Sequence, residues 1–345
     1  MTSKKKDRDY LKDTAGRYWK IIGDYHPEGQ TVSYVKYYPS EFGHKRIGKT
    51  SYSINTHVAT SFPLILDEPD RTCFSKFHGN IVTCTPDTKI ANYFDARLKL
   101  ETIWENPVSY ASHPIGKELV QFVNGLDAAS IRHLGVTGSF LIDAYDENSD
   151  IDLVCYGREG IEVIRKLFSE KVKPYEGQDL IRLYKRRMNH MQPMDFKLFG
   201  VQENRKFQGM MGEGKTHINC QPVRAEENAF ENMTLMDVGE IECTARVLKH
   251  EEGIFAPAIY EIEVIDVLNS LFPNSHEFLH KLRYFISYIG GYANSFRTGD
   301  RVYLKGGLAR VLSKETGTVL YGIELTPWHT STFHRASLLS MESDE

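Results

Sequence analysis

The segment Asp150-Ile151-Asp152-Leu153-Val154 constrains the fold more than any other part of this chain. Ile151 and Leu153 alternate with the two aspartates, so an extended strand directs the apolar pair to a core and both carboxylates to the opposite face. Strand rise places these carboxylates about 6–7 Å apart, close enough to share bound cations. The segment therefore predicts a half-buried strand whose polar face carries chemistry.

The residues around this strand predict an α/β unit. A helix is expected from near Ser112, with Pro114 in its first turn and apolar residues at helical spacing up to Leu126. The short apolar run within residues 131–138 predicts a buried strand before the aspartates. Residues 158–171 follow them with an apolar face of helical periodicity.

The acidic residues between the two strands allow a calcium-loop interpretation, which the spacing rejects. Asp146, Asn148 and Asp150 alternate as the first ligands of an EF-hand do, but that loop needs Gly at its sixth position and Glu at its twelfth. Ile151 and Gly157 occupy those positions. Residues 143–149 are therefore expected to form a solvated turn.

A third carboxylate, Asp195, lies in the segment PMDFKLF, where Met194, Phe196 and Leu198 alternate with Asp195 and Lys197. Residues 180–200 predict two strands joined by a polar turn over residues 189–193. If the strand that carries Asp195 lies beside the strand that carries Asp150 and Asp152, the three carboxylates converge. Each pair of carboxylates then repels by about 3 kcal/mol at about 5 Å and a dielectric near 20. Such a cluster binds divalent cations, and oxygen ligands of this kind suit Mg²⁺, or Mn²⁺, bridged to substrate phosphates.

Gly138 and Ser139 follow the first predicted strand. Glycine permits close backbone approach, and a serine hydroxyl with the amides of a helix N-terminus can hold phosphate oxygens. A phosphate-binding turn eleven residues before a paired-Asp strand has the outline of a nucleotidyl-transfer site.

These motifs resemble those of the DNA polymerase beta-like nucleotidyltransferase superfamily. The matching parts are Gly138-Ser139 after a strand, the strand from Ser149 to Leu153, and Met194-Asp195-Phe196. The segment SDIDLVCYG looks most like a group of uncharacterised archaeal predicted nucleotidyltransferases with extra domains on both sides. The resemblance covers residues 135–200.

The resemblance implies a reaction and a role for each aspartate. Two metal ions held by Asp150, Asp152 and Asp195 would align an acceptor hydroxyl with the α-phosphate of a nucleoside triphosphate. One ion would activate the hydroxyl and the other would offset charge on the pyrophosphate. Asp195 would lie nearest the acceptor and assist its deprotonation.

Basic residues are concentrated between residues 171 and 206, beside the predicted site. We interpret four of them as contacts to the triphosphate or to acceptor phosphates, although a solvated strand edge explains them equally well. These four are Arg182, Lys185, Arg186 and Arg187.

Residues 209–216, GMMGEGKT, match the spacing of a phosphate-binding P-loop and open a rival interpretation as a P-loop ATPase. A P-loop follows a buried strand and opens a helix. Here a polar segment precedes the motif, and the segment after it alternates like a strand and contains Pro222. A glycine-rich hairpin loop is the preferred interpretation, from which Lys215 could still reach a phosphate.

The flanks of the predicted site have a β-rich texture. Residues 16–38 predict a hairpin, residues 88–100 a helical piece, and the chain from about Asp237 an all-β region. We expect an α+β protein: a β-rich N-terminal domain (1–108), a nucleotidyltransferase domain with a central mixed sheet and helices (109–235), and a small C-terminal OB-like β-barrel (236–345).

The composition limits the binding partners, the cysteine chemistry and the cellular location that we expect. The net charge of −4 gives no global drive to bind nucleic acid, so such contacts must be local. Five dispersed cysteines without a CxxC argue against a disulfide framework and a structural zinc. No signal peptide and no apolar run of membrane-spanning length is found, so we expect a cytoplasmic protein without a membrane partner.

The sequence does not identify the acceptor substrate, because an RNA end, a small molecule and a protein side chain can each supply a suitable hydroxyl. A second function is a catalytically silent nucleic-acid-binding or regulatory protein that uses the transferase fold. The C-terminal barrel and the aromatic segment 34–38, which could stack on bases, support it.

Overall fold

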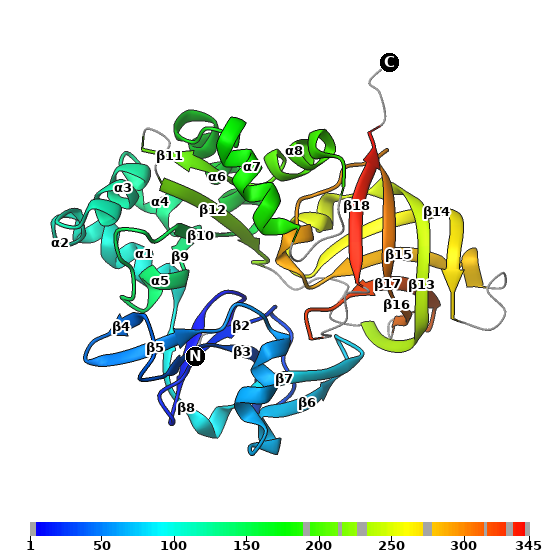
Figure 1. Cartoon of the computed structure of the whole chain (residues 1–345), viewed down its shortest axis with the longest axis horizontal. Coiled ribbons are helices and arrows are strands. Elements are labelled where there is room, and N and C mark those ends of the chain that lie inside the picture. Colours follow the sequence, from blue (N-terminus) through cyan, green and yellow to red (C-terminus); the bar gives the residue numbers. More distant parts are fainter. Residues whose placement is uncertain are drawn as a thin grey trace. The chain divides into compact units, whose positions relative to one another are not determined.

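The computed structural model describes residues 5–188, 194–212, 216–225, 233–271, 278–313, 316–328 and 334–341. The chain forms two compact units, each built from separated segments. The first contains Met1–Thr72, Thr83–Pro174 and Phe207–Glu226, and the second contains Cys73–Val82, Tyr175–Lys206 and Glu227–Glu345. Figure 1 shows that most helices belong to the middle of the sequence, with strands on both sides of it.

A curled antiparallel half-barrel opens the first unit. Its strands follow the order β4-β5-β3-β2-β1-β8, and β7 adds to β3 (Figure 1). The expected hairpin over residues 16–38 is confirmed, because β2 pairs antiparallel with β3. The strands of this sheet are β1 (Tyr10–Asp13), β2 (Tyr18–Ile21), β3 (Gln30–Pro39), β4 (Lys45–Ile47), β5 (Thr50–Ile54), β6 (Thr72–Ser75), β7 (Asn80–Pro86) and β8 (Ile90–Phe94). Most of β6 and the start of β7 fall in the segment Cys73–Val82, which is counted with the second unit.

Each face of the half-barrel carries a hydrophobic cluster, which explains its aromatic and β-branched composition. Leu11, Trp19 and Val35 form a cluster on one face. Tyr10 and Tyr18 lie in a different cluster, which also contains residues of the central sheet. The half-barrel is therefore part of one packed body with the sheet that follows.

The central sheet has the order β11-β12-β10-β9, and it is mixed: β10 runs parallel to β12 and antiparallel to β9. Its strands are β9 (Leu134–Val136), β10 (Ile151–Tyr156), β11 (Gln208–Met211) and β12 (Thr216–Val223). The helices of this unit are α1 (Ala96–Glu105), α2 (Pro107–Ala111), α3 (Pro114–Val123), α4 (Ala128–Ile131), α5 (Gly138–Leu141) and α6 (Gly157–Lys171).

The helices expected near Ser112 and over residues 158–171 are confirmed as α3 and α6. The helical piece expected over residues 88–100 is confirmed only in its second part. Strand β8 occupies residues 90–94, and Asp95 then caps α1 by accepting bonds from the amides of Arg97 and Leu98.

The second unit closes a ring of strands. Strands β13, β14, β15, β17 and β16 pair in this order, and β16 pairs back to β13, while β18 adds to β16. The expected all-β region is thus confirmed, with β15 and β17 parallel to each other. The strands are β13 (Met233–Lys249), β14 (Ala258–Ser270), β15 (Leu282–Ser287), β16 (Arg301–Ser313), β17 (Val319–Leu325) and β18 (Arg335–Ser340).

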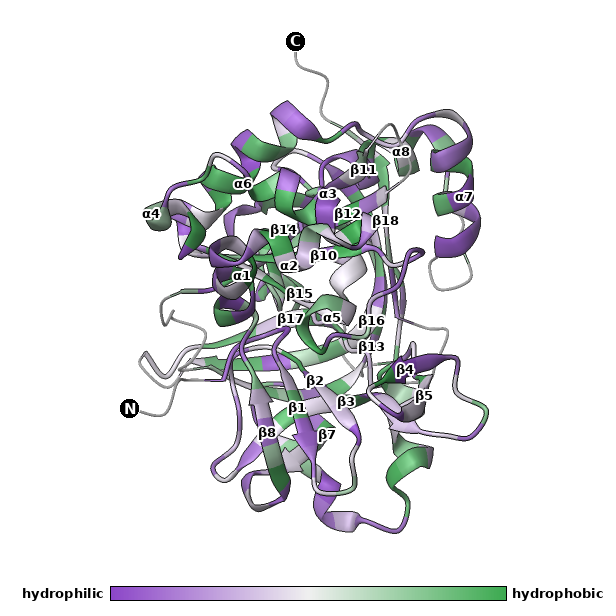
Figure 2. Cartoon of the chain, turned by 90° about the vertical axis from the view of Figure 1, so that its left-hand side faces the viewer, coloured by the Kyte–Doolittle hydropathy of each residue, from purple (hydrophilic) through white to green (hydrophobic). Residues whose placement is uncertain are grey.

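The two strands predicted over residues 180–200 are wrong. The structure forms helices there, α7 (Gly177–Arg187) and α8 (Phe196–Asn204), and the predicted turn over residues 189–193 lies outside the described residues. Leu198 and Val201, three residues apart, pack against the ring core, as one face of a helix does. Figure 2 shows α7 as largely hydrophilic, because its buried side is narrow.

Short 3-10 turns connect these elements, at Ala59–Ile65, Pro69–Arg71, Asp87–Lys89, Glu251–Ile254 and Gly290–Tyr292. No helix within the described ranges is long and apolar enough to cross a membrane. All five cysteines lie in these ranges, and none forms a disulfide.

Candidate active site at the paired-Asp strand

Strand β10 presents the two faces expected from its alternation. Ile151 and Leu153 are fully buried, whereas Asp152 is half-buried and Asp150, just before the strand, is exposed. Val154 and Tyr156 share the face of Asp152, because side chains two residues apart point the same way. Both pack in the cluster that includes tyrosines of the half-barrel. The half-barrel therefore covers the face of the sheet that carries Asp152.

Gly138 lies directly against the carboxylate of Asp152. Strand β9 ends at Val136, the amide of Thr137 donates to the carbonyl oxygen of Asp152 over 2.8 Å, and α5 begins at Gly138. Gly138 has a φ of +65°, and a Cβ at this position would lie 2.2 Å from Oδ2 of Asp152. A side chain at this position would displace the Asp152 carboxylate and strain the backbone, so the close approach to Asp152 favours glycine in the predicted phosphate-binding turn.

Ser139 follows Gly138 at the start of α5 and is half-buried. Its carbonyl oxygen accepts a hydrogen bond of 2.8 Å from the amide of Ala144. The structure thus places Gly138, Ser139 and Asp152 together, although they come from the two sides of a loop.

The neighbour of Asp152 on the adjoining strand is Asn219, not a third carboxylate. Strand β12 pairs in parallel with β10 and places Asn219 opposite Asp152. Nδ2 of Asn219 donates to Oδ1 of Asp152 over 2.5 Å. The carboxylate therefore has one oxygen held by an amide and the other facing Gly138.

The acidic loop before β10 forms the turn expected from its composition. Oδ1 of Asp146 accepts from the amide of Asn148 at 3.0 Å and from Oγ of Ser149 at 3.1 Å. Its other oxygen pairs with Nζ of Lys45 at 2.5 Å. Asp143 has φ +53° and pairs with Lys99. These acids are satisfied by local turn contacts and lysines of the same unit.

The half-barrel supplies positive charge to the region of Asp152. Burial lowers the pKa of Lys20 to about 7, and the charge of Arg8 lowers it further, while Asp152 opposes the shift. Burial also opposes the charge on Arg8, but Asp7, Tyr34 and Asp152 outweigh it and raise the pKa of the guanidinium. Arg8 and Lys20 thus both lie close enough to Asp152 for its charge to act on them.

Tyrosines line the same region. The Tyr10 side chain is fully buried, and its hydroxyl has no hydrogen-bond partner. Burial raises the pKa of Tyr10 well above its ordinary value, with further contributions from Tyr37, Tyr34 and Asp152. Burial and Asp152 likewise raise the pKa of Tyr37.

The remaining predicted site residues belong to the second unit. Asp195 is exposed and caps α8, because Oδ1 accepts from the amides of Lys197 at 2.9 Å and Leu198 at 3.0 Å. The prediction that Asp195 sits on a strand is therefore wrong. The strand that pairs with β10 at this position is β12. The alternation after the glycine-rich motif predicted a strand here but not its partner, because the pairing of strands distant in sequence is decided by tertiary packing.

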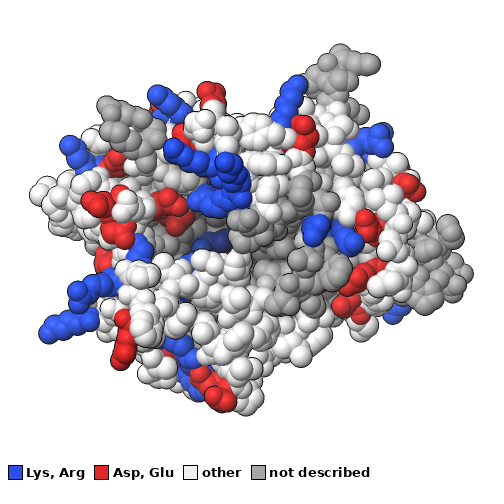
Figure 3. Space-filling view, in the orientation of Figure 1, with Lys and Arg blue, Asp and Glu red and all other residues white. Residues whose placement is uncertain are grey.

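The four predicted basic residues lie on α7, not on a strand edge. Arg182 pairs with Asp179 one turn earlier at 3.3 Å, and Nε of Arg187 lies 3.4 Å from the buried Glu203. Lys185 and Arg186 are exposed. Figure 3 shows a group of Lys and Arg side chains gathered over α7, with acidic side chains elsewhere on the visible face.

A magnesium ion fits part of the predicted ligand set. Asp150 and Asp152 are hard oxygen donors, and Mg²⁺ is commonly bound by one or two carboxylates together with substrate phosphates. Among the described residues, no group of three or more His, Cys, Asp or Glu side chains lies close enough to hold a metal. A metal ion at Asp150 and Asp152 would therefore need ligands from outside this group, such as substrate phosphates.

The P-loop interpretation is wrong in its structural context. Strand β11 includes the first three residues of the motif, Thr216 at its end begins β12, and the two strands pair antiparallel. A P-loop needs a helix where β12 begins. The preferred hairpin is thereby confirmed. Lys215 and the tip of the loop lie outside the described residues.

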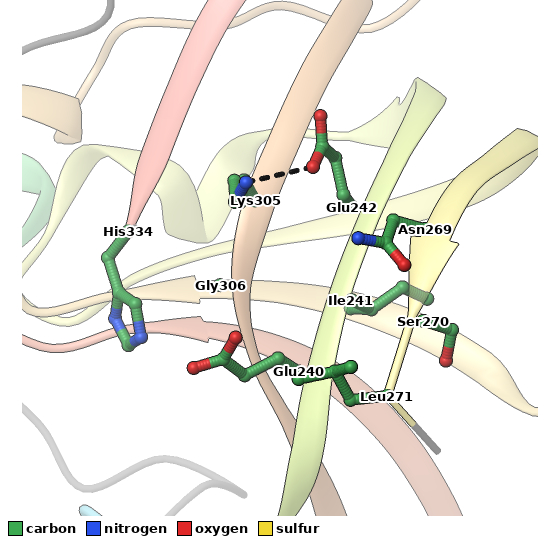
Figure 4. Close-up of a pocket in the computed structure, with 9 residues that line it drawn as sticks. All are labelled: Glu240, Ile241, Glu242, Asn269, Ser270, Leu271, Lys305, Gly306 and His334. Carbon is green, nitrogen blue, oxygen red and sulfur yellow. Dashed lines mark hydrogen bonds and ion pairs between the residues drawn. The ribbon is translucent and has the colours of Figure 1, made fainter. Parts of the chain in front are cut away.

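A hollow of about 310 Å³ lies on the ring of the second unit (Figure 4). Glu240 and His334 approach it from opposite sides of Gly306, and Lys305 is held by Glu242 at 2.9 Å. The Glu242 carboxylate also accepts from the Tyr303 hydroxyl over 2.8 Å. Lys305, the lysine that lines the hollow, is thus already paired with Glu242, so the hollow has little positive charge with which to bind a phosphate.

Comparison with known proteins gives one distant relative. The chain is 20% identical over 346 aligned positions, covering 89% of this chain and 91% of the other, to a protein of Methanocaldococcus jannaschii described as "Uncharacterized protein MJ1086". No protein-family model matches the chain, and no solved structure matches it. The similarity extends over both units but carries no functional description.

Proposed function

We propose that this protein is a metal-dependent nucleotidyltransferase of the DNA polymerase beta-like superfamily. The observation that carries the proposal is the contact between Gly138 and the Asp152 carboxylate. A glycine turn that opens a helix beside a paired-Asp strand brings phosphate-binding amides and cation-binding oxygens to one point. We further propose that the chain is a member of the archaeal group of predicted nucleotidyltransferases and that it is located in the cytoplasm.

In the proposed reaction the acceptor oxygen forms a bond to the α-phosphorus of a nucleoside triphosphate. The bond from that phosphorus to the bridging oxygen of the β-phosphate breaks, the hydroxyl proton is lost and pyrophosphate leaves. A bound Mg²⁺ or Mn²⁺ would offset the negative charge that develops on the phosphates. Asp150 and Asp152 would hold this ion, and Gly138 with Ser139 would receive phosphate oxygens.

The experiment is label transfer. The full chain is incubated with each α-labelled nucleoside triphosphate, Mg²⁺ or Mn²⁺, and total RNA, a metabolite extract or a protein extract. We expect label on one acceptor class and a loss of at least about 100-fold in the double variant Asp150→Asn, Asp152→Asn. Absence of transfer, or transfer unchanged in that variant, would rule the proposal out.

A second candidate, a catalytically silent nucleic-acid-binding or regulatory protein, is favoured by two observations. Asn219 occupies the neighbouring-strand position beside Asp152, where the prediction expected a carboxylate. The strand ring β13-β14-β15-β17-β16 has the strand number of an OB-like barrel, a fold that often binds oligonucleotides. RNA binding in a gel-shift assay, unchanged by the double variant and without label transfer, would select this candidate.

A further inference from the structure

A row of polar side chains crosses the half-barrel opposite Asp152. Tyr10 on β1 pairs with Lys20 on β2, and Lys20 pairs with Tyr34 on β3. Directly paired residues of neighbouring strands project from the same face of a sheet. Tyr10, Lys20 and Tyr34 therefore point to the same side.

That side faces the central sheet. Tyr10 and Tyr18 pack in one cluster with Val154 and Tyr156 of β10. Lys20 lies two residues after Tyr18 on the same strand and so projects toward the same sheet. Asp152 lies on this face of the central sheet two residues before Val154 and is not part of the apolar cluster. Its charge acts on both Lys20 and Tyr10.

Arg8 is fixed at the edge of this row by its backbone. It adopts a φ of +74°, which is unusual for a side chain of this size. Its carbonyl oxygen accepts a 2.5 Å hydrogen bond from Oγ1 of Thr137, the residue before Gly138. Nε of Arg8 donates to Asp7 at 3.0 Å, so the guanidinium is held within the unit by one of its five donors.

Two donors of this row have no partner of their own. The fully buried Tyr10 hydroxyl makes no hydrogen bond, and the half-buried Lys20 forms no ion pair with a carboxylate of the described residues. Leaving a buried donor unsatisfied costs about 1–3 kcal/mol, so a buried hydroxyl such as that of Tyr10 usually has a ligand or water to satisfy it. Lys20 is only half-buried, so its ammonium group can be reached from solvent. A ligand that suits them must accept hydrogen bonds and carry negative charge.

We propose that Lys20, Tyr10 and Arg8 bind the polyphosphate of the substrate from the half-barrel side, opposite Gly138 and Ser139. This proposal deepens the proposed function: it assigns phosphate binding to the half-barrel in place of the basic residues of α7. Ammonium, guanidinium and phenol donors surround an anion whose remaining oxygens meet the Gly138 turn. The Asp152 carboxylate would repel a bare phosphate, so the ligand is a polyphosphate that arrives with a divalent cation.

The test measures binding of Mg²⁺ with inorganic tripolyphosphate, and separately with ATP, to the full chain by isothermal titration calorimetry. Lys20→Met should weaken both ligands about 10- to 100-fold, the range for loss of a charge-assisted hydrogen bond. Lys166→Met, the same substitution at an exposed position of α6, should leave affinity unchanged. Circular dichroism checks that each variant is folded.

Tyr10→Phe is a sharper second variant. It removes only a hydroxyl that has no partner within the protein, so folding should be retained and any loss of affinity belongs to the ligand. We expect about threefold to tenfold weaker binding, as for one neutral hydrogen bond. Lys185→Met tests the earlier assignment to α7 and should have a smaller effect than Lys20→Met.

Unchanged affinity in both Lys20→Met and Tyr10→Phe, or no binding of either polyphosphate by the wild-type chain, would overturn this proposal. These outcomes are separate from those of the label-transfer assay. Lys20-dependent polyphosphate binding without transfer would support the binding site and reject the transferase. Transfer that persists in Lys20→Met with unchanged affinity would keep the transferase and reject the assignment to the half-barrel.

Discussion

Replacement of Gly138 by alanine tests the central geometry of the candidate site. The new Cβ would lie 2.2 Å from Oδ2 of Asp152, whereas ordinary contact begins at 3.4 Å, so the carboxylate must move by about 1.2 Å. The left-handed backbone adds about 1 kcal/mol of strain for a residue with a side chain. Displacement of Asp152 also breaks its 2.5 Å hydrogen bond from Asn219, worth about 1–3 kcal/mol.

We therefore expect Gly138→Ala to lower the free energy of unfolding by about 2–4 kcal/mol. Urea denaturation followed by circular dichroism measures this loss. If the proposed function holds, label transfer should fall about 100-fold, because an error of about 1 Å at a reacting centre has effects of that size.

Gly125 provides a matched control in the same unit. Its φ of +88° carries similar backbone strain, but a Cβ there would meet no atom within 4 Å. Gly125→Ala should cost about 1 kcal/mol and leave transfer intact. Equal losses of stability and activity in the two variants would refute the reasoning, because strain alone would then explain both.

A double-mutant cycle isolates the contact between Gly138 and Asp152. In the background Asp152→Ala, the clash with Oδ2 is removed, so the further change Gly138→Ala should cost the backbone strain and the small shift that relieves the remaining 3.2 Å contact with the Cβ of residue 152. A coupling energy near zero would show that the alanine does not act through the carboxylate.

Two further predictions concern single carboxylates. Burial raises the pKa of Asp9 to about 7. Because the unfolded chain ionises near pH 4 while the folded chain keeps the proton, the free energy of unfolding should fall by about 2–4 kcal/mol from pH 4 to pH 7. Asp9→Asn should flatten that slope in urea titrations, and an identical slope in both proteins would contradict the assignment. At the start of α8, Asp195→Ala should cost about 1 kcal/mol of stability, whereas Asp195→Asn keeps the cap. Loss of transfer with stability retained in Asp195→Asn is the result expected of a third metal ligand, and retained transfer would assign Asp195 to capping alone.

The sequence correctly predicted the elements that have a long periodic pattern of apolar residues or clear turn residues at their ends. Helix α6 has four turns with a continuous apolar face, and the β2–β3 hairpin has turn residues between aromatic runs, so local patterns were sufficient for both. Residues 194–198 gave the wrong answer because five residues that alternate apolar and polar fit a strand and a short helix face about equally. Packing of Leu198 and Val201 on the ring decided for the helix.

For the candidate site, too, some features follow from the local sequence and others only from the tertiary structure. The sequence by itself determined that Gly138, Ser139, Asp150 and Asp152 flank one turn, because strand alternation and a glycine-led helix start are local properties. Only the tertiary structure decided what stands opposite Asp152. Asn219 lies there through the parallel pairing of β12 with β10, across 67 residues of sequence. Arg8, Tyr10 and Lys20 reach the same region because the half-barrel packs its tyrosines on the Asp152 face, and contacts between distant strands follow from complementary packing that no local pattern records.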